Sequence, residues 1–254
     1  MKDAKTGIAP LDVDGTLYPG TLGIDLLRVL MRAELCDLDA AAEVFAIGGA
    51  HQRDEIDFET MARGAYEAYA RALAGRSCAE VEAQARALWE KKRGKLFAFA
   101  PTLIAELRAS GRVPLLISGS PIEMVRLVAD ELGIEEAHGA VFARAEGRYT
   151  GSVALGSGVP GAKAEILAGA FGRRPRDLQR SFAMGDSLTD VAMFEEVGIA
   201  LAFEPTVELA ELAQTRGWPV ATRGDVLERV RTLLCLERLS GSDRTTFDSQ
   251  GSPC

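Results

Sequence analysis

The segment Asp12-Val13-Asp14-Gly15-Thr16 carries two carboxylates at a spacing that could do chemistry. Side chains alternate along a strand, so Asp12 and Asp14 would point the same way, and the glycine after them would let the chain turn sharply. Two carboxylates about 4 Å apart repel by roughly 4 kcal/mol at an effective dielectric constant near 20, so the pair requires a cation or a proton between them. A helix cap or a simple turn uses the same residue types and is the structural alternative.

The segment Gly185-Asp186-Ser187-Leu188-Thr189-Asp190 presents a second acidic pair. Asp190 would fall one helical turn after Asp186 if a helix begins at Ser187, and a helix N-cap would account for one of the two aspartates. In an open parallel sheet the carboxyl ends of the strands share one crevice, so all four carboxylates would converge there. Oxygen ligands without imidazole or thiolate indicate Mg²⁺.

A possible anion site accompanies the aspartates. A predicted turn at Ser118-Gly119-Ser120 places a hydroxyl and a flexible backbone amide after an apolar run, ahead of a helix that opens at Pro121. Lys163 stands at the start of the predicted helix at residues 162–170. Each feature alone is common without a function, so these assignments depend on the aspartates.

Each motif except the lysine follows a short apolar run that predicts a strand. Residues 8–14 would form the first strand, and the later runs are Val113–Ile117, Phe182–Met184, Ile199–Phe203 and Trp218–Ala221. Amphipathic segments follow these runs, and runs that are apolar on both faces suit a parallel sheet covered by helices. We therefore predict an α/β fold with a doubly wound, Rossmann-like parallel sheet.

Helical periodicity dominates the segment between the first strand and its partner helix at Thr102–Ser110. We predict an all-helical cap at residues 20–96, inserted into a core made of residues 1–19 and 97–238, with helices that include Leu22–Leu35, Phe58–Leu73 and Ala79–Lys92. Val141–Leu155 is expected to form a β-hairpin attached to the sheet. The tail at residues 239–254, rich in Ser, Gly, Asp and Thr, is expected to be disordered.

Composition excludes several classes of function. The chain has 254 residues, with 29 Lys and Arg against 37 Asp and Glu, so we expect no nucleic-acid partner. It shows neither a membrane-spanning apolar stretch nor a signal peptide, so we expect no membrane association and a cytoplasmic location. Four scattered cysteines indicate reduced thiols, and two histidines disfavour a histidine metal site.

Taken in order, these segments resemble the haloacid dehalogenase superfamily of phosphotransferases. The order is Asp-x-Asp-Gly-Thr, a serine after a strand, a lysine and Gly-Asp-x-x-x-Asp, and it spans residues 8–222. A helical insertion directly after the first motif, with Ile117-Ser118-Gly119-Ser120-Pro121 and Gly217-Trp218-Pro219 later, is similar to the phosphoserine-phosphatase-like subgroup (subfamily IB, helical C1 cap).

The resemblance implies a role for each matching residue. Asp12 would be the nucleophile and Asp14 the general acid and base. Mg²⁺ would bind Asp12, Asp186 and the main-chain carbonyl of Asp14, with Asp190 acting from the outer shell. Three further groups would hold the phosphoryl oxygens, namely Ser118, the amide of Gly119 and Lys163. The implied reaction is hydrolysis of a small phosphorylated metabolite through an aspartyl-phosphate, in a protein of unknown oligomeric state.

Phosphoserine phosphatase proper is the narrower alternative. Such enzymes carry a glutamate a few residues past the acidic pair and an arginine in the cap, but here Thr21 and Ala65 stand near those places, with Arg63 two residues from the latter. Several other cap side chains are candidates for substrate contacts, although each is also typical of a surface or a cap core: His51, Arg53, Arg63, Tyr66 and Tyr69.

Three rivals from other classes are weighed against this hypothesis. A receiver-like phosphoacceptor has its nucleophile on a later strand than its acidic pair and no helical insertion, so the motif order disfavours it. The second rival is an oxidoreductase that binds a nicotinamide dinucleotide at Gly156–Gly161, which matches the GxGxxG pattern. This segment, however, follows a predicted hairpin strand rather than the first strand of a βαβ unit. A non-catalytic binding protein of the superfamily is disfavoured by the intact motifs.

Overall fold

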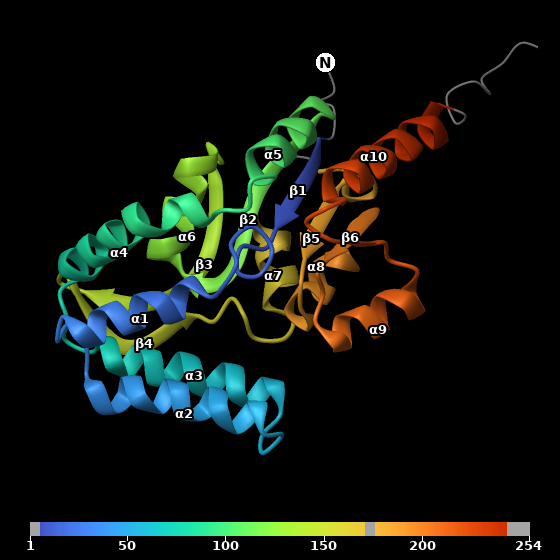
Figure 1. Cartoon of the computed structure of the whole chain (residues 1–254). Helices are drawn as coiled ribbons and strands as arrows, with labels where there is room; N and C mark the ends of the chain where they lie inside the picture. Colours follow the sequence, from blue (N-terminus) through green and yellow to red (C-terminus); the bar gives the residue numbers. More distant parts are fainter. Residues whose placement is uncertain (1–5, 171–175, 243–254) are drawn as a thin grey trace, which may run out of the picture.

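Strand β1 (Gly7–Leu11) lies at the centre of the sheet in this computed structural model, which describes residues 6–170 and 176–242 (Figure 1). Within those residues seven strands pair in the order β4-β3-β2-β1-β5-β6-β7, and only β3 and β4 run antiparallel. The other strands are β2 (Arg112–Pro121), β3 (Glu136–Ala145), β4 (Arg148–Leu155), β5 (Phe182–Gly185), β6 (Ile199–Phe203) and β7 (Val220–Ala221). The predicted doubly wound α/β fold is thus confirmed.

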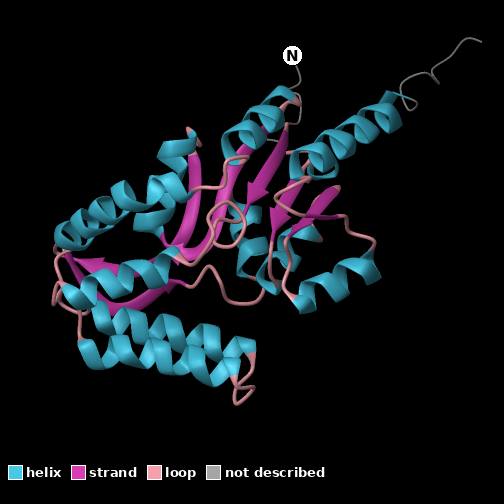
Figure 2. Ribbon diagram, in the orientation of Figure 1, coloured by secondary structure: helices cyan, strands magenta, loops and turns pink. Residues whose placement is uncertain are grey.

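Alternation along the strands divides the core into two layers. In β6, Ile199, Leu201 and Phe203 belong to one buried cluster, whereas Ala200 and Ala202 belong to the other. The first cluster is covered by α5 (Ala100–Ala109), α6 (Ile122–Leu132) and α10 (Val226–Ser242). The second is covered by α7 (Ala162–Gly169), α8 (Val191–Phe194) and α9 (Val207–Arg216). Figure 2 shows the strands between these helices.

The segment between β1 and α5 is helical, as predicted. Its helices are α1 (Leu22–Arg32), α2 (Leu38–Gln52), α3 (Phe58–Leu73) and α4 (Cys78–Lys92), followed by a short 3₁₀ turn. The side chains of Asp37, Asp57 and Ser77 each accept a hydrogen bond from a backbone amide three residues on, which explains where α2, α3 and α4 begin. The α2–α3 pair lies below α1 and β4 in the view of Figure 1.

The β3–β4 hairpin holds the inserted helices to the sheet. The Tyr149 carbonyl accepts from the Gly75 amide at 2.8 Å, and the Gly147 carbonyl accepts from the Cys78 amide at 2.9 Å. The rings of Tyr69 in α3 and Phe142 in β3 stack with centroids 4.9 Å apart. The predicted hairpin therefore exists, and its edge strand is the surface on which α3 packs.

Three boundaries differ from the sequence prediction. Strand β3 begins at Glu136, because its first residues pair in parallel with β2, a role that the polar sequence around His138 does not signal. Strand β1 ends at Leu11, and Asp12–Asp14 enter a turn whose amides bond to the Val13 carbonyl. Strand β2 continues irregularly through Ser118-Gly119-Ser120, where we expected a turn.

The last helix extends further along the chain than predicted, and the described cysteines are free. Helix α10 runs to Ser242, inside the segment expected to be a disordered tail, and residues 243–254 lie outside the described residues. Cys36, Cys78 and Cys235 are free thiols, as predicted, and Cys254 lies outside the description. Within the described part of the chain, no helix has the length and apolar content needed to cross a membrane.

Candidate active site

Asp12 lies directly beyond β1 and faces a buried lysine. The Asp12 amide donates to the Met184 carbonyl of β5 at 3.0 Å, so the residue is held beside the end of β5. Lys163, from the first turn of α7, donates to Asp12 Oδ1 at 2.6 Å and to Asp190 Oδ1 at 2.5 Å. All three side chains are almost fully buried. The lysine thus joins the ends of two acidic segments that are far apart in sequence.

Asp14 is held by hydroxyls of β2 and by the start of α1. Its Oδ1 accepts from the Leu22 amide at 2.8 Å, and its Oδ2 accepts from the hydroxyls of Ser118 at 3.0 Å and Ser120 at 2.5 Å. Ser120 also accepts from the Gly23 amide at 2.7 Å. The irregular end of β2 brings both serine hydroxyls to one carboxylate. We did not predict the part of Ser120.

Asp186 approaches the first acidic segment from β5. A Cβ on Gly15, whose φ is +83°, would lie 2.0 Å from Asp186 Oδ2, so only glycine permits this approach. Asp190 Oδ2 accepts from the amides of Asp186 and Ser187 at 2.9 and 3.0 Å, and Ser187 and Asp190 form a capping box. The helix-cap alternative is therefore correct for Asp190, yet the same carboxylate also binds Lys163.

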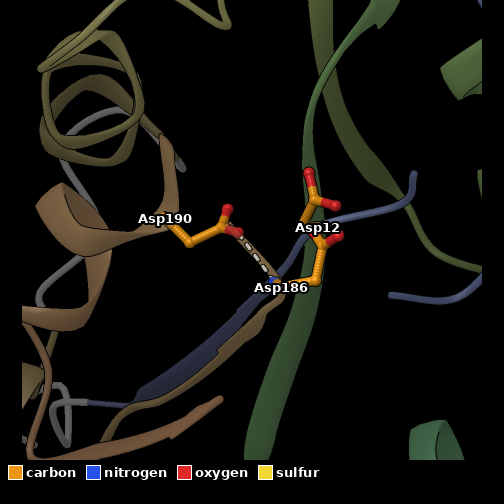
Figure 3. Close-up of side chains that lie close together, drawn as sticks. All are labelled: Asp12, Asp186 and Asp190. Atoms are coloured by element: carbon orange, nitrogen blue, oxygen red, sulfur yellow. Dashed lines mark hydrogen bonds between the residues drawn. The ribbon is translucent and has the colours of Figure 1, made fainter. Parts of the chain in front are cut away.

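Three of the four carboxylates that we expected to converge lie close together, whereas Asp14 bonds to the serine hydroxyls of β2. One oxygen from each of Asp12, Asp186 and Asp190 lies within 4.8 Å of the others, and Figure 3 shows the three side chains turned toward a common space. Both Asp190 oxygens already bond within the protein, whereas the Asp186 carboxylate is half-buried beside them. A set of carboxylate oxygens at this spacing suits a hard divalent cation such as Mg²⁺.

Burial raises the pKa values of Asp12, Asp14 and Asp186. Burial raises the pKa of Asp12 well above its usual value, opposed by Lys163 and reinforced by Asp190 and Asp186. Burial, followed by the charge of Asp190, raises the pKa of Asp186 to about 7. Burial also raises the pKa of Asp14, although the Leu22 amide and the serine hydroxyls act in the opposite direction. The cluster therefore carries an electrostatic cost that a further cation would reduce.

Lys163 remains charged despite its burial. Burial alone would lower its pKa, but the Asp12 and Asp190 carboxylates raise it above its usual value. Its ammonium group is therefore a permanent positive charge at the end of β1. A phosphoryl group brought to Asp12 would meet this charge.

Tyr66 of α3 joins the inserted helices to the loops around the site. Its hydroxyl donates to the Gly119 carbonyl and accepts from the Gly158 amide, both at 2.8 Å. A Cβ on Gly158 would lie 2.5 Å from this hydroxyl, and one on Gly156 would lie 3.2 Å from the ring. These two glycines of the GxGxxG pattern therefore make room for a tyrosine, which is a role that sequence reasoning missed.

We expect Tyr66→Phe to lower the free energy of unfolding by about 1–3 kcal/mol, because the Gly119 carbonyl and the Gly158 amide lose their partner. Gly158→Ala should also destabilise the wild type, since its methyl group would collide with the hydroxyl. In the Tyr66→Phe background, Gly158→Ala should lower the free energy of unfolding by a smaller amount. Urea denaturation of the four proteins measures this coupling, and additive losses would contradict the packing explanation.

The other candidate cap contacts do not line the cavity that Asp12, Asp14 and Asp186 line. Arg53 pairs with Glu55 at 2.7 Å and Arg63 with Glu59 at 2.9 Å, with all four side chains more than half exposed. His51 Nδ1 contacts the Ile56 carbonyl at 3.1 Å. Tyr69 is buried and donates to the Gly23 carbonyl at 3.1 Å, so it belongs to the packing of α3.

A family model supports the chemistry suggested by this geometry. Residues 9–195 match the model for haloacid dehalogenase-like hydrolase, which covers more than half of the chain. The chain belongs to this family. The match includes the segments of Asp12, Ser118, Lys163 and Asp190, and it confirms both the resemblance and the hydrolase class that the sequence predicted.

Several relatives of this chain are named as phosphatases. A probable phosphatase of Mycobacterium tuberculosis is 36% identical over 128 residues, which cover 49% of this chain but only 43% of that relative. The match thus spans less than half the length of that protein. The phosphoserine phosphatase SerB1 of the same organism is 30% identical over 224 residues, covering 85% of this chain and 70% of that protein.

Solved structures share the fold at lower identity. A Bordetella pertussis protein superposes with a TM-score of 0.72 at 24% identity, covering 87% of this chain and 100% of that one. A phosphoserine phosphatase in a phospho-aspartyl intermediate analogue form gives a TM-score of 0.61 at 22% identity, covering 86% and 94%. These similarities extend over most of the chain and confirm the predicted fold.

Proposed function

We propose that this chain is a Mg²⁺-dependent phosphomonoesterase that hydrolyses a small phosphorylated metabolite through an aspartyl-phosphate on Asp12. The observation that carries the proposal is the convergence of Asp12, Asp14 and Asp186 on one cavity, with Lys163 bonded to Asp12. Residues 20–96 serve in this proposal as the cap over the core formed by residues 1–19 and 97–238. Phosphoserine phosphatase proper remains the narrower form of the proposal.

In the first step an Asp12 oxygen attacks phosphorus, and the bond from phosphorus to the ester oxygen breaks. Asp14 gives its proton to the departing alcohol, and the raised pKa of Asp14 favours the protonated form that this transfer needs. In the second step water attacks the aspartyl-phosphate and Asp14 takes its proton. Inorganic phosphate leaves, and both carboxyl groups return to their starting states.

Asp12 and Asp186, with the main-chain carbonyl of Asp14, would hold Mg²⁺, and Asp190 would position Lys163 and the loop at Asp186 rather than provide a ligand of its own. The hydrogen bonds of Asp190 support this division of roles, because its Oδ1 accepts from Lys163 and its Oδ2 accepts from two backbone amides. When bound, Mg²⁺ supplies positive charge that offsets the repulsion between Asp12 and the phosphoryl oxygens.

Lys163, Ser118 and the Gly119 amide would bind the phosphoryl oxygens. Lys163 is already bonded to Asp12 and so would lie beside the transferred group. The Ser118 hydroxyl donates to Asp14, so this bond must be exchanged for one to a phosphoryl oxygen when substrate binds. That exchange would also release Asp14 toward the leaving alcohol.

The direct test is to trap the covalent intermediate. With p-nitrophenyl phosphate and Mg²⁺, we expect Asp14→Asn to form phosphoenzyme, because this leaving group needs no proton, but to hydrolyse it roughly 10²–10⁴-fold more slowly. Intact-protein mass spectrometry should show one added phosphoryl group, and peptide mapping should place it on Asp12. A label on another residue, or phosphoenzyme that decays at the wild-type rate, would contradict the assigned roles.

Mg²⁺ should also stabilise the fold at neutral and alkaline pH. The pKa of Asp186 rises to about 7 in the folded chain, so without metal this carboxyl contributes a loss of stability as pH increases from about 4 to 7. At pH 8, Mg²⁺ at about 100 times its Kd should raise Tm by about 5–10 °C.

Asp186→Asn should raise Tm in the presence of a chelator, because it removes one charge from the cluster, and should abolish most of the Mg²⁺ response. Differential scanning calorimetry at pH 5 and pH 8 measures both effects. Glu211→Gln, an exposed change on α9, is the matched control and should keep the full response. An Asp186→Asn protein that still responds like the wild type would remove Asp186 from the metal site.

A further inference from the structure

The cavity beside the aspartates has two walls of different chemistry. It measures about 350 Å³, a volume near the lower end of ordinary small-molecule sites. One wall carries Asp12, Asp14 and Asp186. The facing wall is one side of α3, formed at helical spacing by Phe58, Met61, Ala62, Ala65 and Tyr66.

The α3 wall offers no charge to a ligand. The Tyr66 hydroxyl is already bonded to Gly119 and Gly158, so this residue presents mainly its ring. In the described part of the chain, the side chains that line the cavity include no lysine, arginine, histidine or glutamate. The remaining polar lining consists of hydroxyls, from Thr21, Ser187 and Thr189.

The charged residues of α3 project elsewhere. Arg63 pairs with Glu59 one turn earlier on the same helix, and both are exposed. Arg71, near the end of α3, pairs with Glu43 of α2 at 2.6 Å. The helix therefore carries its guanidinium groups on sides other than the one facing the aspartates.

We propose, on the basis of the phosphatase function argued above, that the substrate is a phosphomonoester whose alcohol part is uncharged and has an apolar face. Once the phosphoryl group is placed at Asp12, the alcohol part lies against the α3 wall. An amino-acid carboxylate there would lose its water without gaining a cation, and it would also face three aspartates. Its ammonium group would compete with the leaving alcohol for Asp14, whose oxygens accept three protein hydrogen bonds before substrate binds.

The test measures, in the presence of Mg²⁺, the hydrolysis of four phosphate esters of primary alcohols: butyl phosphate, phosphoethanolamine, 3-phosphonooxypropanoate and O-phospho-L-serine. We expect kcat/KM for butyl phosphate to exceed that for phosphoserine by at least about 10-fold. Intrinsic reactivity cannot produce this order, because the ammonium group makes serine the better leaving alcohol. A kcat/KM for phosphoserine equal to or above that for butyl phosphate would overturn the inference while leaving the phosphatase function intact.

Two variants locate the preference on α3. Ala65→Arg places a guanidinium group on the wall and should lower the ratio of butyl phosphate to phosphoserine kcat/KM by at least about 10-fold. Arg63→Ala, the control on an exposed side of the same helix, should leave the ratio unchanged. A ratio that rises strongly in Arg63→Ala would show that Arg63 reads the substrate, and it would overturn the inference.

A binding measurement separates this inference from the proposed function. Calorimetry with the wild-type protein and Mg²⁺ compares pentylphosphonate with 2-amino-4-phosphonobutanoate, neither of which can be hydrolysed. Tighter binding of pentylphosphonate supports the uncharged alcohol part even if no ester is turned over, an outcome that would defeat only the phosphatase proposal. Tighter binding of the amino acid would overturn the inference.

Discussion

Asp12→Asn is expected to lower kcat by about 10⁴-fold or more while the protein stays folded. The asparagine side chain has the same shape, but its amide oxygen is a poor nucleophile toward phosphorus, and the next carboxylate after β1, that of Asp14, is held by the start of α1 and by hydroxyls of β2. The fold should tolerate the change because the amide oxygen can still accept from Lys163, which also keeps its bond to Asp190.

Steady-state hydrolysis of p-nitrophenyl phosphate with Mg²⁺ measures the loss, and far-ultraviolet circular dichroism with a thermal scan verifies the fold. Asp130→Asn is the matched control, since Asp130 is exposed on α6 away from the cavity, and it should keep the wild-type kcat. An Asp12→Asn protein with kcat within tenfold of the wild type would remove Asp12 from the nucleophilic role.

The strand pattern allowed the fold to be predicted because burial on both faces leaves a clear signature. The runs that became β5 and β6 are short, apolar and followed by helical periodicity, and residues of opposite parity went to opposite sides of the sheet. The first half of strand β3 carried no such signature, because polar residues such as Glu136 and His138 take their place there through pairing with β2. This parallel pairing depends on a neighbouring strand that periodicity does not report.

The meeting of Asp12 with Asp186 could be predicted because the rule about strand ends concerns topology rather than side chains. The bonds of Asp14 could not. Regular alternation would place Ser118 and Ser120 on one side of β2, but it does not show which group they meet. Their bonds to Asp14 depend on where the irregular end of β2 lies. The predicted turn at these residues was wrong for the same reason.

The packing of Tyr66 against two glycines could not be predicted from the glycine motif. The sequence argued against a dinucleotide site at Gly156 and Gly158, but it could not show what these glycines do, because their role depends on the register of α3 against a loop some 90 residues later, as the hydrogen bond between Tyr66 and Gly158 shows. Likewise the sequence shows Thr21 and Ala65 near positions where charged groups were expected. Only the packing of α3 shows that Arg63 lies on another side of the helix.

Lys163→Met should be the most destabilising single change at this site. Lys163 is 1% exposed and lies between Asp12 and Asp190, which are 4% and 0% exposed, so its removal leaves two buried carboxylates without their shared partner. Loss of one member of a buried ionic group costs about 3–5 kcal/mol. We expect that loss in urea denaturation at pH 7 with a chelator present, a smaller loss with Mg²⁺, and no measurable phosphatase turnover.

Lys92→Met is the matched control for Lys163→Met. Lys92 pairs with Asp25 at 2.9 Å, but the two side chains keep 25% and 20% of their surface exposed, so the loss of Lys92 should lower the free energy of unfolding by less than the loss of Lys163 does. Adding Asp12→Asn to Lys163→Met should restore part of the stability, because it removes one of the two unpaired charges. If the double variant is instead less stable than Lys163→Met, the lysine stabilises the fold by the packing of its hydrocarbon stem rather than by its charge.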